Sequence, residues 1–235
     1  MTAAVAGSLV DQAVRRVRQH IRERDLKVGD TLPGEGQFAA DLGVSRAVMR
    51  EAFGALAALR LIDVGNGRKA RVGAIDGSVM AASIDHAVAT AQITTAEVWD
   101  VRRSLELRTV ALAASNRTDA DAVEITKHAR EMTASDGDVD RLIGHDIAFH
   151  QAIARAGGNA LFHQIVRSFE QLMRIAVPTA WNTRSTPAER DAVFVIHCRI
   201  AEAIADRDAA SAETLMDAHF AKSISDVFER NDRSR

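Results

Sequence analysis

The sequence has little that would indicate a secreted, membrane-spanning or sheet-rich protein. Its one cysteine, Cys198, cannot form an internal disulfide. No apolar run reaches the roughly 18 residues that a membrane-spanning helix needs. The N-terminus lacks the segments of a signal peptide, so we expect a cytoplasmic protein with no membrane partner. Tyrosine is absent, prolines number 3 and aromatics make up 4% of the residues, which favours helices over sheets.

Length and charge both suggest two parts. A chain of 235 residues is long enough for two domains. Residues 1–75 hold 12 Lys and Arg against 8 Asp and Glu, whereas residues 76–235 hold 18 against 24. A basic first part on an acidic body is typical of a protein that contacts nucleic acid, although chance variation in solvated charge explains the asymmetry about as well.

The first part has the element order of a winged helix-turn-helix. Apolar periodicity, glycine turns and a Ser45 N-cap define these elements. We expect helices over 8–24, 35–42 and 46–60 and strands over 61–64 and 69–72. The third helix is the candidate recognition helix, because Arg46 and Arg50 project from one face of its first turns. Such arginines can bind guanine or phosphate, but a pair of ordinary solvated arginines has the same spacing.

The expected hairpin carries basic residues where a wing would touch DNA, namely Arg68, Lys69 and Arg71. The motifs from Leu32 to Glu35 and from Leu42 to Arg46, followed by the wing glycine, resemble the DNA-binding domain of the GntR family of regulators over roughly residues 9–73. The resemblance implies a double-stranded DNA operator as partner. The predicted DNA-contacting residues are Ser45, Arg46, Ala47, Arg50, Gly67, Arg68 and Lys69.

Two departures from that family pattern concern DNA binding. Gly36 stands where the family usually has an arginine that often contacts DNA. The wing runs from Gly67 to Val72 as Gly-Arg-Lys-Ala-Arg-Val, whereas the family usually has Gly-x-Gly-Thr-Phe-Val. We therefore expect an operator that differs from the common one, with the basic wing compensating for the missing arginine.

Everything after a linker near 73–77 has helical periodicity. We expect helices over 78–91, 95–115, 119–134, 138–156, 159–176, 187–206 and 209–230. The loops between them are short, which is typical of an antiparallel bundle. The predicted fold is therefore mainly α, with an N-terminal winged helix-turn-helix domain over 1–75 and a C-terminal all-α antiparallel helical bundle over 76–235.

Four residues in the expected bundle could hold a metal ion. Asp146 and His150 are four residues apart and share one helix face. His197 and His219 lie in two later apolar helices that could bring them face to face if adjacent. One carboxylate and three imidazoles suit Zn²⁺, Ni²⁺ or Mn²⁺ and leave coordination positions open. The spacing is also compatible with hydrogen-bonded core histidines.

The same four positions resemble the metal ligands of the FadR-like branch of the family, whose ligand-binding domain is called FCD. The resemblance implies a divalent metal, with zinc expected first. It also implies that Arg102 points into an effector pocket, where a guanidinium would bind a carboxylate. Without the resemblance, a structural ion pair between Arg102 and Glu106 is the simpler interpretation.

These patterns together predict a homodimeric transcription regulator. We expect a repressor whose operator binding is controlled by a small organic or sugar acid at the metal-containing helical domain. One alternative is a metal-dependent hydrolase or lyase acting on a small carboxylate, although no His-Glu-x-x-His element supports it. Another alternative is a regulator in which the metal is purely structural.

Overall fold

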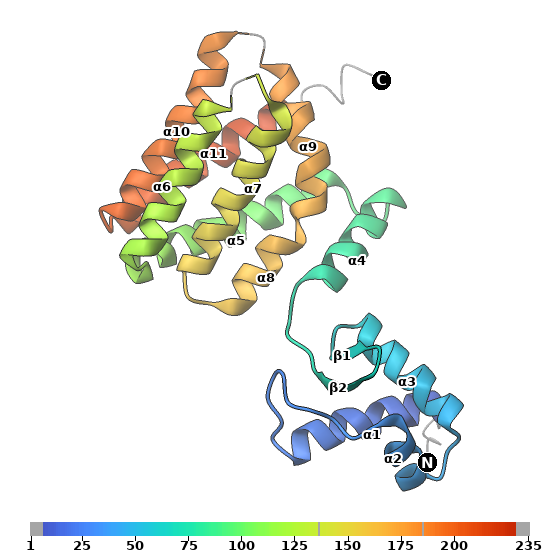
Figure 1. The fold of residues 1–235 in the computed structure, drawn as a ribbon. Coiled ribbons are helices and arrows are strands. Elements are labelled where there is room, and N and C mark those ends of the chain that lie inside the picture. The colour runs from blue at the N-terminus through green and yellow to red at the C-terminus, as the bar shows by residue number, and fades with distance from the viewer. Residues whose placement is uncertain (1–6, 136, 185, 229–235) are drawn as a thin grey trace, which may run out of the picture. The chain divides into compact units, whose positions relative to one another are not determined.

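The structure is a computed structural model that describes residues 7–135, 137–184 and 186–228. Its contacts divide the chain into two compact units, Met1–Val79 and Met80–Arg235. Figure 1 labels the helices and strands of both units. Within the described residues, none of the helices combines the length and apolar character that crossing a membrane requires.

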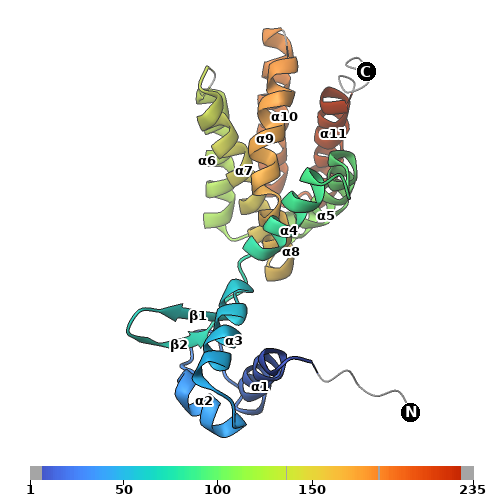
Figure 2. The same ribbon diagram turned by 90° about the vertical axis from the view of Figure 1, so that its right-hand side faces the viewer.

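The first unit has the element order that the sequence predicts. Its elements are α1 (Leu9–Glu23), α2 (Glu35–Leu42), α3 (Arg46–Ala58), β1 (Ile62–Gly65) and β2 (Arg68–Val72). The two strands pair antiparallel, with Ile62 opposite Val72, and form the hairpin that is seen beside α3 in Figure 2. Gly67 has a φ of 70°, a conformation that glycine adopts without strain at the turn.

Local sequence signals explain where the helices of this unit begin and end. Gly43 has a φ of 66° and ends α2, and the Ser45 hydroxyl accepts a hydrogen bond from the backbone of Val48 to start α3. The buried face of α3, which includes Met49 and Leu56, packs in the core of the unit. The opposite face of α3 is therefore left for solvent or a partner.

The regular elements of the second unit are all helices over the residues that the structure describes, as predicted. Its helices are α4 (Ser78–Ala89), α5 (Thr95–Asn116), α6 (Asp119–Ala134), α7 (Val139–Ala156), α8 (Ala160–Ser168), α9 (Glu170–Thr183), α10 (Pro187–Ala205) and α11 (Ala209–Phe228). Helix α5 packs against α7 and α11, and α10 packs against α6 and α11. The helices form a bundle around one apolar core (Figure 2).

The prediction of one helix over 159–176 was wrong. The chain forms α8 and α9, which are separated at Phe169. The Phe169 amide bonds the carbonyl of Val166, three residues back, and its side chain is only 3% exposed. A buried ring and a tightened last turn therefore mark the boundary between the two helices. Helix α9 then continues past Pro178 to Thr183, although proline removes one backbone hydrogen bond.

Candidate functional site

The first turns of α3 present an exposed polar face. Arg46, Ala47 and Arg50 are all exposed there, and Ser45 is exposed as the N-cap. The Arg50 Nε lies 3.7 Å from a Glu35 carboxylate oxygen, a distant and solvated contact worth little energy. All four predicted residues of the recognition helix therefore stay available to a partner.

The Arg46 guanidinium lies over Gly36, the position at which this chain departs from the family pattern. A Cβ built on Gly36 would lie 3.6 Å from the Nε of Arg46. The space that a larger residue at position 36 would enter is thus already lined by the side chain of Arg46. Position 36, where the family usually has an arginine, therefore lies next to Arg46 of the neighbouring helix.

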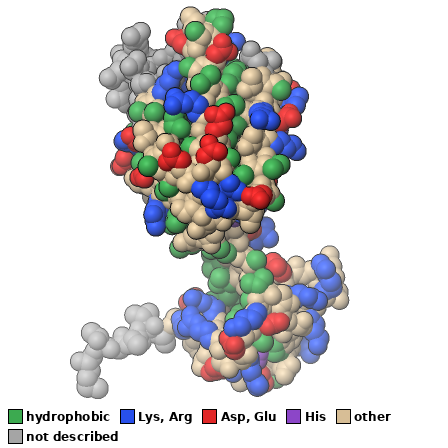
Figure 3. All heavy atoms as spheres, turned by 90° about the vertical axis from the view of Figure 1, so that its left-hand side faces the viewer, with side chains coloured by type: hydrophobic (Ala, Val, Ile, Leu, Met, Phe, Trp, Pro, Cys, Tyr) green, Lys and Arg blue, Asp and Glu red, His purple; other side chains and the backbone are tan. Residues whose placement is uncertain are grey.

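The hairpin presents Gly67, Arg68 and Lys69 as exposed residues. Arg71 differs from its expected place at the tip, because its Nη1 donates a hydrogen bond to the carbonyl of Gly29 at 3.3 Å. Arg71 is therefore held against the loop before α2, whereas Arg68 and Lys69 are the basic side chains next to the turn. Figure 3 shows Lys and Arg side chains distributed over the visible face of this unit.

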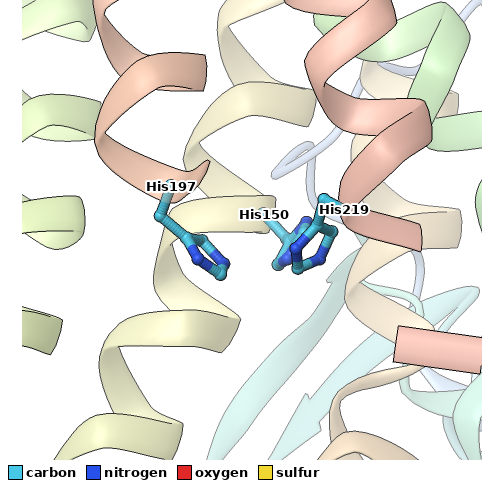
Figure 4. Close-up of side chains that lie close together, drawn as sticks. All are labelled: His150, His197 and His219. Carbon is cyan, nitrogen blue, oxygen red and sulfur yellow. The ribbon is translucent and has the colours of Figure 1, made fainter. Parts of the chain in front are cut away.

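The second unit brings three histidines of distant sequence together. His150 of α7, His197 of α10 and His219 of α11 each offer a ring nitrogen within 4.8 Å of the others, and their rings converge in Figure 4. The carboxylate of Asp146 joins them, with Oδ1 lying 3.2 Å from His197 Nε2 and 3.9 Å from His150 Nε2. All four predicted metal-site residues therefore lie at one place.

Two of these imidazoles are oriented through their outer nitrogens. The Nδ1 of His197 donates to the carbonyl of Val193 at 2.7 Å, and the Nδ1 of His150 hydrogen-bonds the carboxylate of Glu106. Such bonds place the proton on Nδ1 and leave the lone pair on Nε2. Both Nε2 atoms are buried and have no hydrogen-bond partner among the described residues. This donor set fits a divalent metal ion.

The electrostatics of the cluster also favour a cation. Burial would raise the pKa of the Asp146 carboxyl, but the His197 ring nitrogen 3.2 Å away and the other nearby imidazoles hold that pKa below its usual range. Burial and the neighbouring histidines His197 and His150 lower the pKa of His219 well below its ordinary value. Asp146 is thus ionised and His219 neutral near pH 7, which are the forms that bind metals.

Arg102 pairs with Glu106 and also lines a cavity. Its Nε and Nη2 lie 2.8 Å and 2.7 Å from one carboxylate oxygen of Glu106, which is the ion pair that the simpler interpretation expects. Its guanidinium carbon also lies 5.2 Å from the Trp99 ring and 5.3 Å from the Phe220 ring, and the residue lines a cavity.

This cavity has a volume of about 40 Å³ and adjoins the histidine cluster. Its lining residues are Trp99, Arg102, Met132, Leu142, Asp146, His150, Met173, Val177, Trp181, Arg184, Val193, Phe194, His197, His219 and Phe220. The sequence analysis assigned no part in lining a cavity to Trp99, Trp181 or Phe194. It missed Arg184 entirely and did not see that Glu106 would orient His150, since neither role leaves a local pattern.

Comparison with known protein families identifies the family to which each of the two units belongs. Residues 9–72 match the bacterial regulatory proteins of the gntR family, and residues 97–222 match the FCD domain. The chain belongs to the gntR family and carries an FCD domain. The two matched segments fall within the winged helix-turn-helix and the helical bundle, respectively.

Individual gntR-family relatives agree with this assignment. The HTH-type transcriptional regulator LutR of Bacillus subtilis is 29% identical, covering 90% of this chain and 99% of its own length. The Glc operon transcriptional activator of Escherichia coli is 32% identical over 77% of this chain and 74% of its own length. The solved structure of Streptococcus agalactiae GntR superposes with a TM-score of 0.66, covering 91% of this chain and 97% of that one at 23% identity.

This gntR-family chain is therefore a DNA-binding transcription regulator. Its C-terminal domain, the FCD domain, is of an effector-binding type. The relatives are transcription regulators and do not favour the hydrolase or lyase alternative. Their names include an activator and, for the 28% identical HTH-type transcriptional repressor NanR of Citrobacter rodentium, a repressor.

Proposed function

We propose that this regulator is a homodimeric, non-enzymatic repressor that senses a small organic or sugar acid through a bound divalent metal. The N-terminal domain over 1–75 would bind the operator, and the domain over 76–235 would bind metal and acid. The observation that carries the sensing part is the pair of buried Nε2 atoms on His150 and His197, which face Asp146 and His219 without a hydrogen-bond partner among the described residues.

Asp146, His150, His197 and His219 would hold the metal. Zinc suits three imidazoles and one carboxylate best, and nickel or manganese are the alternatives. When bound, the metal supplies positive charge and open positions for the oxygens of an acid. Glu106 and the carbonyl of Val193 would keep the two buried imidazoles in the tautomer that binds it.

Arg102 would bind the carboxylate of the effector. Its guanidinium lines the cavity, and Nη1 faces the thioether of Met173 rather than a carboxylate. A flexible methionine can yield to an incoming anion, and a buried guanidinium binds a carboxylate through charge-assisted hydrogen bonds. Glu106 would hold the rest of the guanidinium in place.

The exposed residues of the first unit would read the operator. Ser45, Arg46, Ala47 and Arg50 belong to the candidate recognition helix, and Gly67, Arg68 and Lys69 to the wing. A dimer would place one such domain on each half-site of a roughly palindromic operator. An acid that binds one arrangement of the dimer better than another shifts operator affinity by that difference.

The test is a thermal-shift screen of organic and sugar acids on metal-free and zinc-loaded protein, followed by operator binding. The duplex probe covers the region upstream of the protein's own gene. We expect acids to raise the melting temperature only with metal and to weaken duplex binding. Stabilisation without any change in duplex affinity would indicate a structural metal, and metal-dependent turnover of an acid would support the enzyme alternative.

A further inference from the structure

One buried hydrogen-bond donor at the cavity has no part in the function proposed above. It is the indole N–H of Trp99, a residue of α5 that is only 3% exposed and lines the cavity. Its Nε1 is buried and has no hydrogen-bond partner among the described residues. A buried N–H group is nearly always hydrogen-bonded in native proteins, because leaving it without an acceptor is unfavourable. We therefore expect its acceptor to be a group of a molecule that enters the cavity.

The position of Trp99 on α5 places this donor where the effector's carboxylate is expected. Trp99 precedes Arg102 by one helical turn, so the two side chains share one helix face. The Arg102 guanidinium carbon lies 5.2 Å from the Trp99 ring, and both residues line the same cavity as His150 and His197. The indole of Trp99 therefore lies beside the group proposed to bind the carboxylate.

The polar side chains beside Trp99 either donate hydrogen bonds or belong to the proposed metal site. An arginine and an indole are donors and cannot accept a hydrogen bond. Among the described lining residues, Asp146 has the one carboxylate, and it would bind the metal. Glu106 is already bonded to Arg102 and His150. The effector group that meets Trp99 therefore has to be an acceptor oxygen, since an ammonium group would meet only donors and the metal.

The size of the cavity limits the size of the effector. A volume of about 40 Å³ has room for about three water-sized groups. A carboxylate takes up most of this room, and an oxygen on the neighbouring carbon takes up the rest. A short hydroxy or keto acid supplies both groups, and its second oxygen is an acceptor for an indole N–H.

We propose that Trp99 donates a hydrogen bond through Nε1 to the hydroxyl or keto oxygen of a short effector acid. The regulator then distinguishes hydroxy and keto acids from unsubstituted acids and from amino acids. The proposal rests on the sensing function described above. Arg102 and the metal would bind the carboxylate, and Trp99 would bind the oxygen on the neighbouring carbon. Trp99 is thus a specificity-determining residue of this site.

The first test is calorimetric titration of the zinc-loaded full chain with acids that share a carbon skeleton. Lactate, pyruvate, propionate and alanine form one set, and α-hydroxybutyrate, α-ketobutyrate, butyrate and α-aminobutyrate form a longer one. We expect the hydroxy or keto acid of at least one set to bind at least about 10-fold more tightly than the unsubstituted acid. The amino acid should bind most weakly, because its ammonium group cannot accept the hydrogen bond.

Two variants assign the preference to its residue. Trp99→Phe keeps a buried ring and removes the donor. Its affinity for the hydroxy or keto acid should fall by about 3- to 10-fold, the range for one hydrogen bond, whereas its affinity for the unsubstituted acid stays unchanged. Trp181→Phe is the matched control, because Trp181 is also 3% exposed and also lines the cavity. It should keep the wild-type preference.

Nuclear magnetic resonance observes the hydrogen bond itself. The chain has 2 tryptophans, so the indole N–H signal that remains in Trp181→Phe belongs to Trp99. We expect this signal to shift downfield, and its proton to exchange more slowly with solvent, when the hydroxy or keto acid binds. The unsubstituted acid should produce a smaller change. A residue that only packs against the cavity would show no such difference between the two acids.

The outcomes separate this inference from the function on which it rests. Equal affinity for the substituted and unsubstituted acids of each set, or equal weakening of all of them by Trp99→Phe, would overturn the role of Trp99 and leave metal-dependent sensing intact. Failure of every one of these acids to bind would also overturn it, whereas the sensing function is contradicted only if no acid of the wider screen stabilises the zinc-loaded protein. If Trp99→Phe does not fold, as judged by circular dichroism, an indole signal of Trp99 that responds equally to lactate and propionate would overturn the assignment.

Discussion

The two units of this regulator place arginine in opposite environments. Arg46 and Arg50 are exposed on a helix whose other face is buried, whereas Arg102 is only 3% exposed and paired with Glu106. Exposed guanidinium groups suit a large anionic partner and act through contacts that salt weakens. Buried ones act at short range and need a partner in place before the ligand arrives. Changes in the first unit should therefore alter DNA affinity, and changes in the second should alter metal and ligand binding.

The largest effect that would test this separation is loss of the metal. His197→Ala removes one of the two imidazoles whose Nε2 is buried without a hydrogen-bond partner among the described residues. We expect zinc affinity to fall more than about 100-fold, since loss of a supporting residue alone already has an effect of 10- to 100-fold. Zinc content after dialysis, measured by mass spectrometry, is the readout.

His86→Ala is the control for that variant, because His86 is an exposed histidine of α4. It should keep the full zinc content. Equal zinc content in His197→Ala and wild type would show that the histidine cluster is only a set of core residues. That result would contradict the proposed metal site.

The next largest effect concerns the exposed unit. Arg46→Ala should weaken operator binding by about 10- to 100-fold, the range for an arginine that contacts a base edge, and leave zinc content unchanged. Arg108→Ala, an exposed arginine of α5, should leave operator binding unchanged. Fluorescence anisotropy with a labelled duplex measures both, and an Arg46→Ala protein that binds as tightly as wild type would contradict the recognition helix.

The same contrast explains how much the sequence could predict. The fold of the first unit was predictable because its signals are local: the Ser45 cap and the glycines at 43 and 67 each act within a few residues. The convergence of the histidines was expected from the spacing of Asp146 and His150 together with the family resemblance. Both the spacing and the resemblance can be recognised in the sequence without knowing which distant segments are in contact.

Features that depend on tertiary contacts were missed for that reason. The boundary between α8 and α9 lies at Phe169, whose ring is buried by tertiary contacts, and the bond from Arg71 to Gly29 joins segments far apart in the chain. Glu106 was recognisable only as a neighbour of Arg102, four residues away, and its bond to His150 crosses from α5 to α7. The predicted helix ended at residue 176, whereas α9 continues to Thr183 and has Arg184 as its C-cap.

A smaller effect should appear in the pH dependence of the metal-free protein. The pKa of His219 is lowered in the fold, first by burial and then by His197 and His150, and returns to about 6.5 on unfolding. The unfolded state therefore takes up a proton more readily, so the stability from neutral His219 is present above about pH 6.5 and is lost as the pH falls. We expect the melting temperature to drop by several degrees between about pH 7.5 and 5.5.

The variant His219→Phe shows whether this group is responsible. It removes the titrating imidazole, so the drop between the two pH values should become smaller in metal-free protein. His86→Ala again serves as the control and should show the wild-type drop. An unchanged drop in His219→Phe would mean that other groups control the acid stability of this unit.

The smallest effect concerns the role of Gly36 in operator binding. It tests whether the operator needs the glycine backbone itself at this position or only the absence of a large side chain. A Cβ at this position would lie 3.6 Å from the nearest atoms, those of the Arg46 guanidinium, which is ordinary contact. Gly36→Ala should therefore leave operator affinity within about twofold while it stabilises the first unit by about 0.5 kcal/mol, because alanine loses less backbone entropy in a helix. Urea unfolding and anisotropy measure the two quantities. A fivefold or greater loss of affinity would mean that the backbone at Gly36 approaches the operator closely, so that the glycine itself, and not the basic wing, compensates for the missing arginine.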